Sequence, residues 1–261
     1  MPVPDALRLA IGTLTRVPVP PPRRVDRSVA GMAMGLAPLV GIALAVVVGG
    51  IAQLLAPHLP PTASPLLLAA LMIGALAYAT RAIHLDGLAD TADALGSGRP
   101  ADQALDIARR SDIGPFGVVT LVLTLLVQVI ALGGLVADGR SLSALVVAVG
   151  TSRLAIVVGC ARGVPAARPD GLGAMVAGTL APWVVALEIV AWLALCAALG
   201  LLAAPAAAIA SVVSAVAALA VAALLLRICV RRLGGITGDT LGAAVELTMT
   251  AALVILVVLP A

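Results

Sequence analysis

The sequence is poor in charged residues and contains no lysine. Of its 261 residues, 11% are charged and 62% are hydrophobic, and the mean hydropathy is +1.17. A soluble domain has about 25% charged residues. These values exclude an ordinary soluble domain and indicate an integral membrane protein embedded in a lipid bilayer. The net charge of +3 and the short polar segments exclude a nucleic-acid-binding surface.

Aromatic residues and cysteines are also scarce. One phenylalanine, one tyrosine and two tryptophans are too few to form the aromatic belts that often mark membrane interfaces. The three cysteines lie within or beside apolar runs, without the C-x-x-C spacing of a redox or metal motif. We therefore expect Cys160, Cys196 and Cys229 to be small buried hydrophobic residues.

Long uncharged runs predict about seven transmembrane helices, with a range of six to eight, because a helix needs about 20 residues to cross the hydrocarbon layer. The expected fold is an all-α polytopic membrane protein with a single transmembrane domain over residues 1–261. The N-terminal segment is too interrupted by proline and charge for a signal peptide, and we expect a short cytoplasmic arm. The predicted spans are 31–56, 62–80, 115–137, 142–161, 182–202, 206–226 and 242–260.

The arginines indicate how the chain is oriented. If the spans alternate in direction, four arginine-bearing segments share one side of the membrane, and the other side receives only Arg140. By the positive-inside rule that side is the cytoplasm, which places the N-terminus inside and the protein in the inner (cytoplasmic) membrane. The four segments are 8–27, 81–110, 162–168 and 227–232. Two polar stretches on this side, about 81–114 and 227–241, are the predicted active-site segments.

Three aspartates stand out in "HLDGLADTADAL", residues 84–95. On a helix, Asp86, Asp90 and Asp93 project within a stripe about 60° wide. Like charges at this spacing repel each other, and no basic residue lies four positions further on to compensate. Carboxylate oxygens suit a hard divalent ion, and Mg²⁺ is commonly held by one or two carboxylates together with substrate phosphates. The stripe therefore predicts a magnesium site; the alternative is a solvated helix face.

His84 begins the same motif. It points about 200° away from Asp86 if the helix already includes it. A role as general base therefore requires a non-helical backbone at this point, which Gly87 would permit.

Further charges follow the aspartate motif. Asp106 and Arg110 have the i, i+4 spacing of an ordinary ion pair. The alternative is that Arg109 and Arg110 contact phosphate groups.

A second motif, "RRLGGITGDTLGAAVEL" at 231–247, combines glycine, threonine and an acid just before an apolar helix. Such a loop can present backbone N–H groups to an anion beside the positive end of the helix, and it is equally typical of an ordinary loop. Asp239 and Glu246 share one face of the helix and are candidates to complete a metal site or to cap its N-terminus. The predicted phosphate-binding residues are Gly234, Gly235, Thr237 and Gly238.

Three charged residues fall inside predicted spans: Arg153, Glu188 and Glu246. An ionisable residue within the membrane is a functional candidate by default. We take Arg153 and Glu246 as the stronger candidates; Arg153 could instead neutralise nearby acids structurally.

The sequence resembles the cobalamin synthase family, the adenosylcobinamide-GDP ribazoletransferases, almost from end to end. The motifs occur in the family's order, and the aspartate and GGITGD motifs are the specific ones. One departure is that Arg81 and Ala82 stand where the family more often has a glycine pair. The motifs are "LTRVPVP" (14–20), "GLAPLVG" (35–41), "HLDGLADTADAL" (84–95), "RRSDIGPFG" (109–117), "RPDGLG" (168–173) and "RRLGGITGDTLGA" (231–243).

The resemblance implies a magnesium-dependent membrane enzyme. Such an enzyme joins adenosylcobinamide-GDP to α-ribazole or its 5′-phosphate, gives adenosylcobalamin or its 5′-phosphate, and releases GMP. With this reaction, Asp86, Asp90 and Asp93 would hold Mg²⁺ against the diphosphate, and Asp239 with the glycine loop would hold a second phosphate or metal. Asp93 or His84 would take the hydroxyl proton. The sequence is also compatible with an oligomer.

Two other functions fit the composition less well. A CDP-alcohol phosphotransferase also carries an Asp-rich membrane helix, but its wider pattern has an arginine where this chain has Asp90, and its later aspartates are absent. A cation transporter would place its ligands within broken helices near the middle of the membrane, whereas these acids collect at helix ends and in polar segments.

Overall fold

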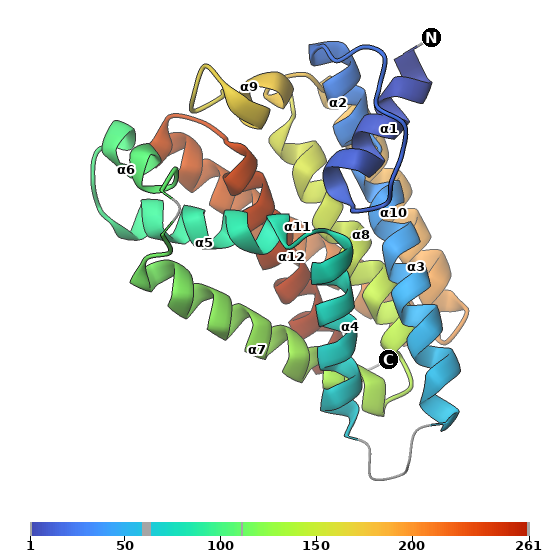
Figure 1. Ribbon diagram of the computed structural model, residues 1–261. Helices are drawn as coiled ribbons and strands as arrows, with labels where there is room; N and C mark the ends of the chain where they lie inside the picture. The colour runs from blue at the N-terminus through green and yellow to red at the C-terminus, as the bar shows by residue number, and fades with distance from the viewer. Residues whose placement is uncertain (1, 59–63, 111, 260–261) are drawn as a thin grey trace.

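The protein is built from helices, as the composition predicts (Figure 1). The structure, a computed structural model, describes residues 2–58, 64–110 and 112–259. Over these residues it contains no strand, only two isolated β-bridges. The helices are α1 (Pro2–Leu14), α2 (Arg27–Gly35), α3 (Ala37–Leu55), the 3-10 turn η1 (Ala56–His58), α4 (Pro65–Ala79), α5 (Ile83–Gly96), α6 (Ala101–Ile107), α7 (Pro115–Ala137), α8 (Ser141–Gly159), α9 (Gly171–Val176), α10 (Pro182–Leu201), α11 (Pro205–Leu233) and α12 (Gly238–Val258).

Proline and glycine set several helix ends. Four long helices begin on a proline, whose fixed φ and missing N–H suit the first helical position. These residues are Pro65, Pro115, Pro182 and Pro205. Helix α11 ends at Gly234, whose φ of 83° lies in the left-handed region that glycine adopts without strain.

Among the residues that the structure describes, six helices are long and apolar enough to span a membrane, and the pair α4 and α5 brings the number to seven if it is counted as one broken span. These helices confirm the prediction of about seven spans. The pair is bent by 89°, so that α5 runs across the bundle (Figure 1). Within this pair α4 is the apolar, spanning part. Because α5 has only 14 residues and carries three aspartates, we place it outside the spanning segments.

Some predicted boundaries need correction. The span expected at 31–56 is two helices, α2 and α3, with a break at Leu36, because Pro38 starts a new helix. The span expected at 206–226 continues to Leu233. Residues 62–63 and 260 of two other predicted spans lie outside the described residues.

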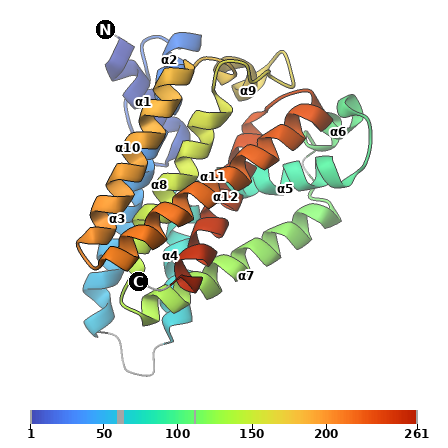
Figure 2. The same cartoon turned by 180° about the vertical axis from the view of Figure 1, so that it is seen from behind.

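Helix α8 is the central helix of the bundle. In its most apolar window 83% of the residues are buried, compared with 22% in α3 and in α10. It packs against α3, α10, α11 and α12, as Figure 2 shows from behind. Residues on every face of α8 are therefore shielded from lipid, including Arg153.

The arginine-rich segments gather toward one end of the bundle, as the sequence predicts. Helices α1, α2 and α9 lie together at this end, and the connections at 138–140 and 202–204 lie at the other (Figures 1 and 2). The N-terminal arm is an amphipathic helix, because α1 buries Ala6, Ala10 and Leu14 along one face.

Candidate active site

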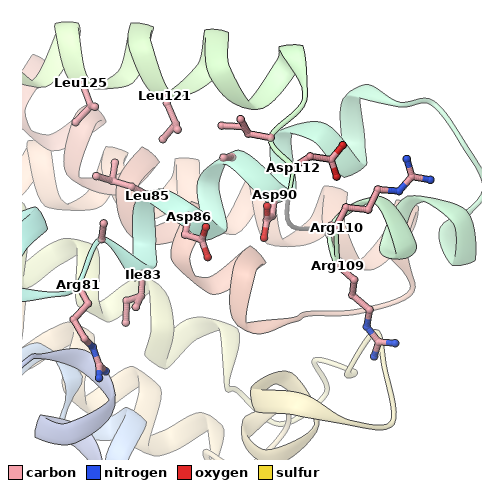
Figure 3. Close-up of a pocket in the computed structure, with 14 residues that line it drawn as sticks. Arg81, Ile83, Leu85, Asp86, Asp90, Arg109, Arg110, Asp112, Leu121 and Leu125 are labelled. Carbon is pink, nitrogen blue, oxygen red and sulfur yellow. The ribbon is translucent and has the colours of Figure 1, made fainter.

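A cavity of about 740 Å³ lies between α5 and the first half of α7 (Figure 3). Its walls carry three carboxylates, three arginines, and apolar side chains from both α5 and α7. The charged residues are Asp86, Asp90, Asp112, Arg81, Arg109 and Arg110, and the apolar ones include Leu85, Leu121 and Leu125. Such a volume suits a small-molecule site.

Asp86 and Asp90 lie one helical turn apart on α5 and line this cavity together, as Figure 3 shows. The prediction that they share a helix face is confirmed, because α5 is continuous from Ile83 to Gly96. The two aspartates lie between Arg81 on one side and Arg109 and Arg110 on the other (Figure 3).

The carboxylate of Asp90 is repelled by neighbouring carboxylates. Burial, followed by repulsion from Asp86, Asp239 and Asp93, raises the pKa of Asp90 to about 7, while Arg168 opposes the shift. Asp90 therefore exchanges its proton near neutral pH, and a cation bound beside it would favour the ionised form.

Asp239 brings a third carboxylate to the site from another part of the chain. It lies in the first turn of α12, where the Thr237 hydroxyl donates a hydrogen bond of 3.2 Å to its Oδ2. A Cβ atom at position 87 would lie 2.8 Å from the Asp239 Cα, so α5 and α12 touch at this point. Two motifs about 150 residues apart thus form one acidic cluster.

A second cavity of about 380 Å³ lies on the other side of Asp239. It is lined by Thr237, Gly238 and Asp239 together with Arg109 and Arg168. Arg109 also lines the larger cavity, so the two cavities meet at this arginine.

Asp93 does not line the cavity with Asp86 and Asp90, although the helical stripe predicts that the three act together. Its Oδ2 accepts a hydrogen bond of 2.7 Å from the Gly114 N–H, and its Oδ1 accepts one of 2.9 Å from the Gly117 N–H. The side chain is 7% exposed and lines neither cavity. Asp93 therefore fixes the start of α7, and we do not retain it as a metal ligand or proton acceptor.

His84 is also turned away from the cavities. The helix already includes it, which is the condition under which the sequence places it opposite the aspartates. Burial, and then the charge of Arg153, lowers the pKa of His84 well below its usual range, so the imidazole is neutral. Because it is buried and lines neither cavity, a role as general base is not supported.

The glycine loop acts differently from the prediction. Gly234 ends α11, and the Gly235 backbone packs against the segment 165–167, where a Cβ atom would lie 2.4 Å from the Ala166 carbonyl carbon. Only Thr237 and Gly238 of the predicted phosphate cradle line a cavity. The glycines at 234 and 235 therefore shape the loop, because their backbone is engaged by protein.

The arginine pairing expected from the sequence is also corrected. Helix α6 ends at Ile107, so Arg110 is no longer one helical turn from Asp106, and no ion pair joins them in the described part of the chain. Instead, Arg109 Nη2 lies 2.7 Å from Asp170 Oδ1 and 2.9 Å from Oδ2. Sequence reasoning missed Arg168 as a site residue; its motif, "RPDGLG", was the only indication.

Comparisons with known proteins identify the family. A family profile described as Cobalamin-5-phosphate synthase matches residues 6–257. A protein of Frankia casuarinae named adenosylcobinamide-GDP ribazoletransferase is 41% identical over 258 residues, covering 95% of this chain and 93% of the relative. Proteins with the same name from a Nocardioides species and from Sinorhizobium medicae are 42% identical over 250 residues and 36% over 261, with at least 94% of each chain covered.

The chain belongs to the cobalamin-5-phosphate synthase family. It is therefore a transferase of cobalamin biosynthesis and a multi-pass membrane protein. No solved structure matches it. The family match favours the first of the three functions considered from the sequence.

In this member of the synthase family, no group of three or more His, Cys, Asp or Glu side chains is placed to hold a metal ion by itself, over residues 2–58, 64–110 and 112–259. Asp86 and Asp90, one helical turn apart on α5, share the larger cavity with a third carboxylate, Asp112. A metal at this point would need further oxygen ligands from substrate or water.

Two of the three charges predicted inside spans, Arg153 and Glu246, form a separate cluster in this synthase fold, and the third, Glu188, lines a different cavity. Arg153 and Glu246 both line a cavity of about 10 Å³, about the size of one water molecule. Gln128 Nε2 donates hydrogen bonds of 2.9 Å to Glu246 Oε2 and 3.0 Å to Thr250 Oγ1. Neither Arg153 nor Glu246 lines the two larger cavities, so this cluster joins the spanning helices to each other.

Proposed function

We propose that this protein transfers the cobinamide phosphate of adenosylcobinamide-GDP to α-ribazole or its 5′-phosphate, with Mg²⁺, giving adenosylcobalamin or its 5′-phosphate and GMP. The relatives' name describes this donor and acceptor. The observation that carries the proposal is the pair of carboxylates, Asp86 and Asp90, which share one cavity with Arg109 and Arg110.

The residues present fit a magnesium ion that is shared with a substrate diphosphate. Asp86 and Asp90 offer the one or two carboxylates that Mg²⁺ usually takes from protein, and the remaining ligands would be phosphate oxygens and water. The raised pKa of Asp90, caused by burial and by Asp86, is the repulsion that a bound cation would offset. Such an ion would neutralise the diphosphate and act as a Lewis acid.

The reaction requires little covalent chemistry from the protein. A ribose hydroxyl oxygen of the acceptor forms a bond to the phosphorus that carries cobinamide, and the bond from that phosphorus to the GMP oxygen breaks. The hydroxyl proton leaves as the new bond forms. Arg109 and Arg110, at one end of the larger cavity, would bind the phosphate oxygens and stabilise the negative charge on the departing GMP.

The hydroxyl proton needs an acceptor other than Asp93 or His84, because neither side chain lines a cavity. Asp239 is the carboxylate that lies at the contact between α5 and α12 and lines the smaller cavity. We assign the proton acceptor to Asp239.

The proposed membrane orientation depends on the end of the molecule where the arginines and the two cavities lie. The arginine-bearing segments and the two cavities share residues, notably Arg109 and Arg168. By the positive-inside rule this end faces the cytoplasm, where nucleotide substrates are found, and the protein resides in the inner membrane.

The test is release of GMP from adenosylcobinamide-GDP by the full-length protein in lipid nanodiscs, with acceptor and Mg²⁺. We expect turnover to need Mg²⁺ and to fall roughly a hundredfold or more in Asp90→Asn, since a preorganised charge at the reacting centre is removed. Asp102→Asn, an exposed aspartate on α6, is the matched control and should retain activity. Ion flux without GMP release would instead identify a transporter, and unchanged turnover in Asp90→Asn would refute this site.

A further inference from the structure

The smaller cavity is a polar compartment distinct from the cavity that holds Asp86 and Asp90. It has about half the volume, 380 Å³ compared with 740 Å³. Its polar side chains come from Arg109, Arg168, Asp170, Thr237 and Asp239, and Leu172 supplies its one large apolar side chain. Arg109 lines both cavities. Asp86 and Asp90 line the larger one, and Asp239 lines the smaller one.

Arg168 is held in this cavity by the backbone around it. The Ala167 N–H donates a hydrogen bond of 2.9 Å to the Ile236 carbonyl, and the Ile236 N–H donates one of 2.9 Å to the Pro165 carbonyl. Gly235 permits this close approach because it has no side chain. Arg168 Nη2 also donates to the Leu105 carbonyl. The glycine loop thus places Arg168 beside Asp239.

The cationic groups of this cavity lie close to each other. Burial, and then the nearby charge of Arg109, lowers the pKa of Arg168, which remains a cation at neutral pH. Asp170 pairs with Arg109, which leaves Arg168 without an ion-pair partner within 4.0 Å among the described residues. A dianion between the two arginines would relieve their repulsion.

The first turn of α12 adds to this preference for an anion. Gly238 and Asp239 line the cavity and are the first two residues of a 21-residue helix. The positive end of the helix dipole therefore points toward the same space as Arg168.

We propose that the smaller cavity binds the phosphate monoester of the acceptor substrate, and that Arg168 determines the preference for a 5′-phosphorylated ribazole over the free nucleoside. This inference rests on the proposed function. The larger cavity, with three carboxylates, three arginines and an apolar wall, suits the diphosphate end of the donor. The smaller cavity suits a nucleoside monophosphate, with Leu172 against the base and the acceptor directed at Asp239.

The first test is equilibrium binding to the full-length protein in nanodiscs, without donor, so that it does not depend on turnover. We expect the wild type to bind α-ribazole 5′-phosphate more tightly than α-ribazole. Arg168→Gln should weaken the binding of α-ribazole 5′-phosphate by about tenfold to a hundredfold and leave the binding of α-ribazole unchanged. Arg168→Lys should restore part of the affinity. Arg162→Gln, an exposed arginine in the same segment, should bind as the wild type does.

The inference is overturned if the wild type shows no preference for the phosphorylated acceptor, or if Arg168→Gln keeps that preference. A competition measurement on the wild type covers the case in which Arg168→Gln does not fold. Ribose 5-phosphate should displace α-ribazole 5′-phosphate but not adenosylcobinamide-GDP, and displacement of the donor would assign the cavity to the diphosphate instead. The proposed function itself fails separately, if the wild type releases no GMP.

Discussion

Gly87 of α5 lies directly against the backbone of Asp239 at the start of α12. A Cβ atom at position 87 would lie 2.7 Å from the Asp239 carbonyl oxygen, which is closer than packed atoms approach. The contact joins the aspartate motif to the glycine-loop motif, and it sets how near Asp239 comes to Asp86 and Asp90.

The first prediction concerns this contact. Gly87→Ala should separate α5 from α12 and destabilise the protein by about 1–3 kcal/mol, as overpacking does, with a large loss of GMP release. Gly74→Ala in α4 is the control, because a Cβ atom there meets nothing within 4 Å; it should keep or raise thermal stability. Equal melting temperatures and activities for the two variants would show that the contact is unimportant.

The second prediction separates Asp93 from Asp90. Asp93→Asn replaces one acceptor oxygen with an NH₂ group that faces a backbone N–H of α7. We expect it to lower thermal stability by about 1–3 kcal/mol and to leave the Mg²⁺ concentration for half-maximal activity unchanged. Asp90→Asn should raise the Mg²⁺ concentration for half-maximal activity and leave thermal stability unchanged. A raised Mg²⁺ requirement in a fully stable Asp93→Asn protein would restore Asp93 as a ligand.

The third prediction is a pH dependence of the Mg²⁺ requirement. The pKa of Asp90 is raised to about 7 by burial and by the neighbouring aspartates, and protons compete with Mg²⁺ for the carboxylate. Below pH 7 the ionised fraction falls, so the apparent Mg²⁺ affinity should weaken by up to about tenfold per pH unit. Above pH 8 it should be constant.

A variant checks the cause of this pH dependence. Asp86→Asn removes the strongest neighbouring repulsion on Asp90, so the midpoint of the Mg²⁺ affinity profile should move to lower pH. Titrations of activity with Mg²⁺ from pH 5.5 to pH 9, about 1.5 units below and 2 units above the pKa, measure both profiles. A profile that is flat between pH 6 and pH 8 in the wild type would contradict the raised pKa.

The fourth prediction concerns Ala82, which has a φ of 55° in the left-handed region. This conformation costs a residue with a side chain about 1–2 kcal/mol. Glycine would remove that cost, but its greater backbone entropy in the unfolded state offsets about 0.5–1 kcal/mol of the gain. Ala82→Gly should therefore raise thermal stability slightly.

Arg81, with a φ of 57°, is the comparison for Ala82. Its Nη2 donates hydrogen bonds of 2.9 Å to the Gly12 carbonyl and 3.0 Å to the Thr13 carbonyl, so Arg81→Gly should give no gain. The measurement is the melting temperature of each variant relative to the wild type in the same detergent. A lower melting temperature for Ala82→Gly would show that the turn is unstrained.

The sequence predicts most of the helices and places together two of the three carboxylates of the acidic cluster. Asp86 and Asp90 are four residues apart in one helix, so helical geometry alone places them on one face. The departure at Arg81 and Ala82 is also visible in the sequence. Both residues have a left-handed backbone, which accounts for a preference for glycine at these two positions.

Other features depend on contacts between distant segments. Asp93 shares the helical stripe with Asp90, but α7 approaches and takes both its oxygens. The RPDGLG motif does not show which groups Arg168 meets, and Arg168 reaches Asp239 because the segments 165–167 and 235–236 pair through their backbones.

The sequence alone was enough to predict the class of the protein and its approximate spans, because hydropathy and helical period are local properties of the chain. Only the tertiary structure decided which carboxylates face a cavity and which arginines accompany them. The physical reason is that the helical repeat fixes the direction in which a side chain points from its own helix. The groups that the side chain then contacts depend on which helix packs against that face. The contact between Gly87 and Asp239, which joins positions more than half the chain apart, is the clearest case.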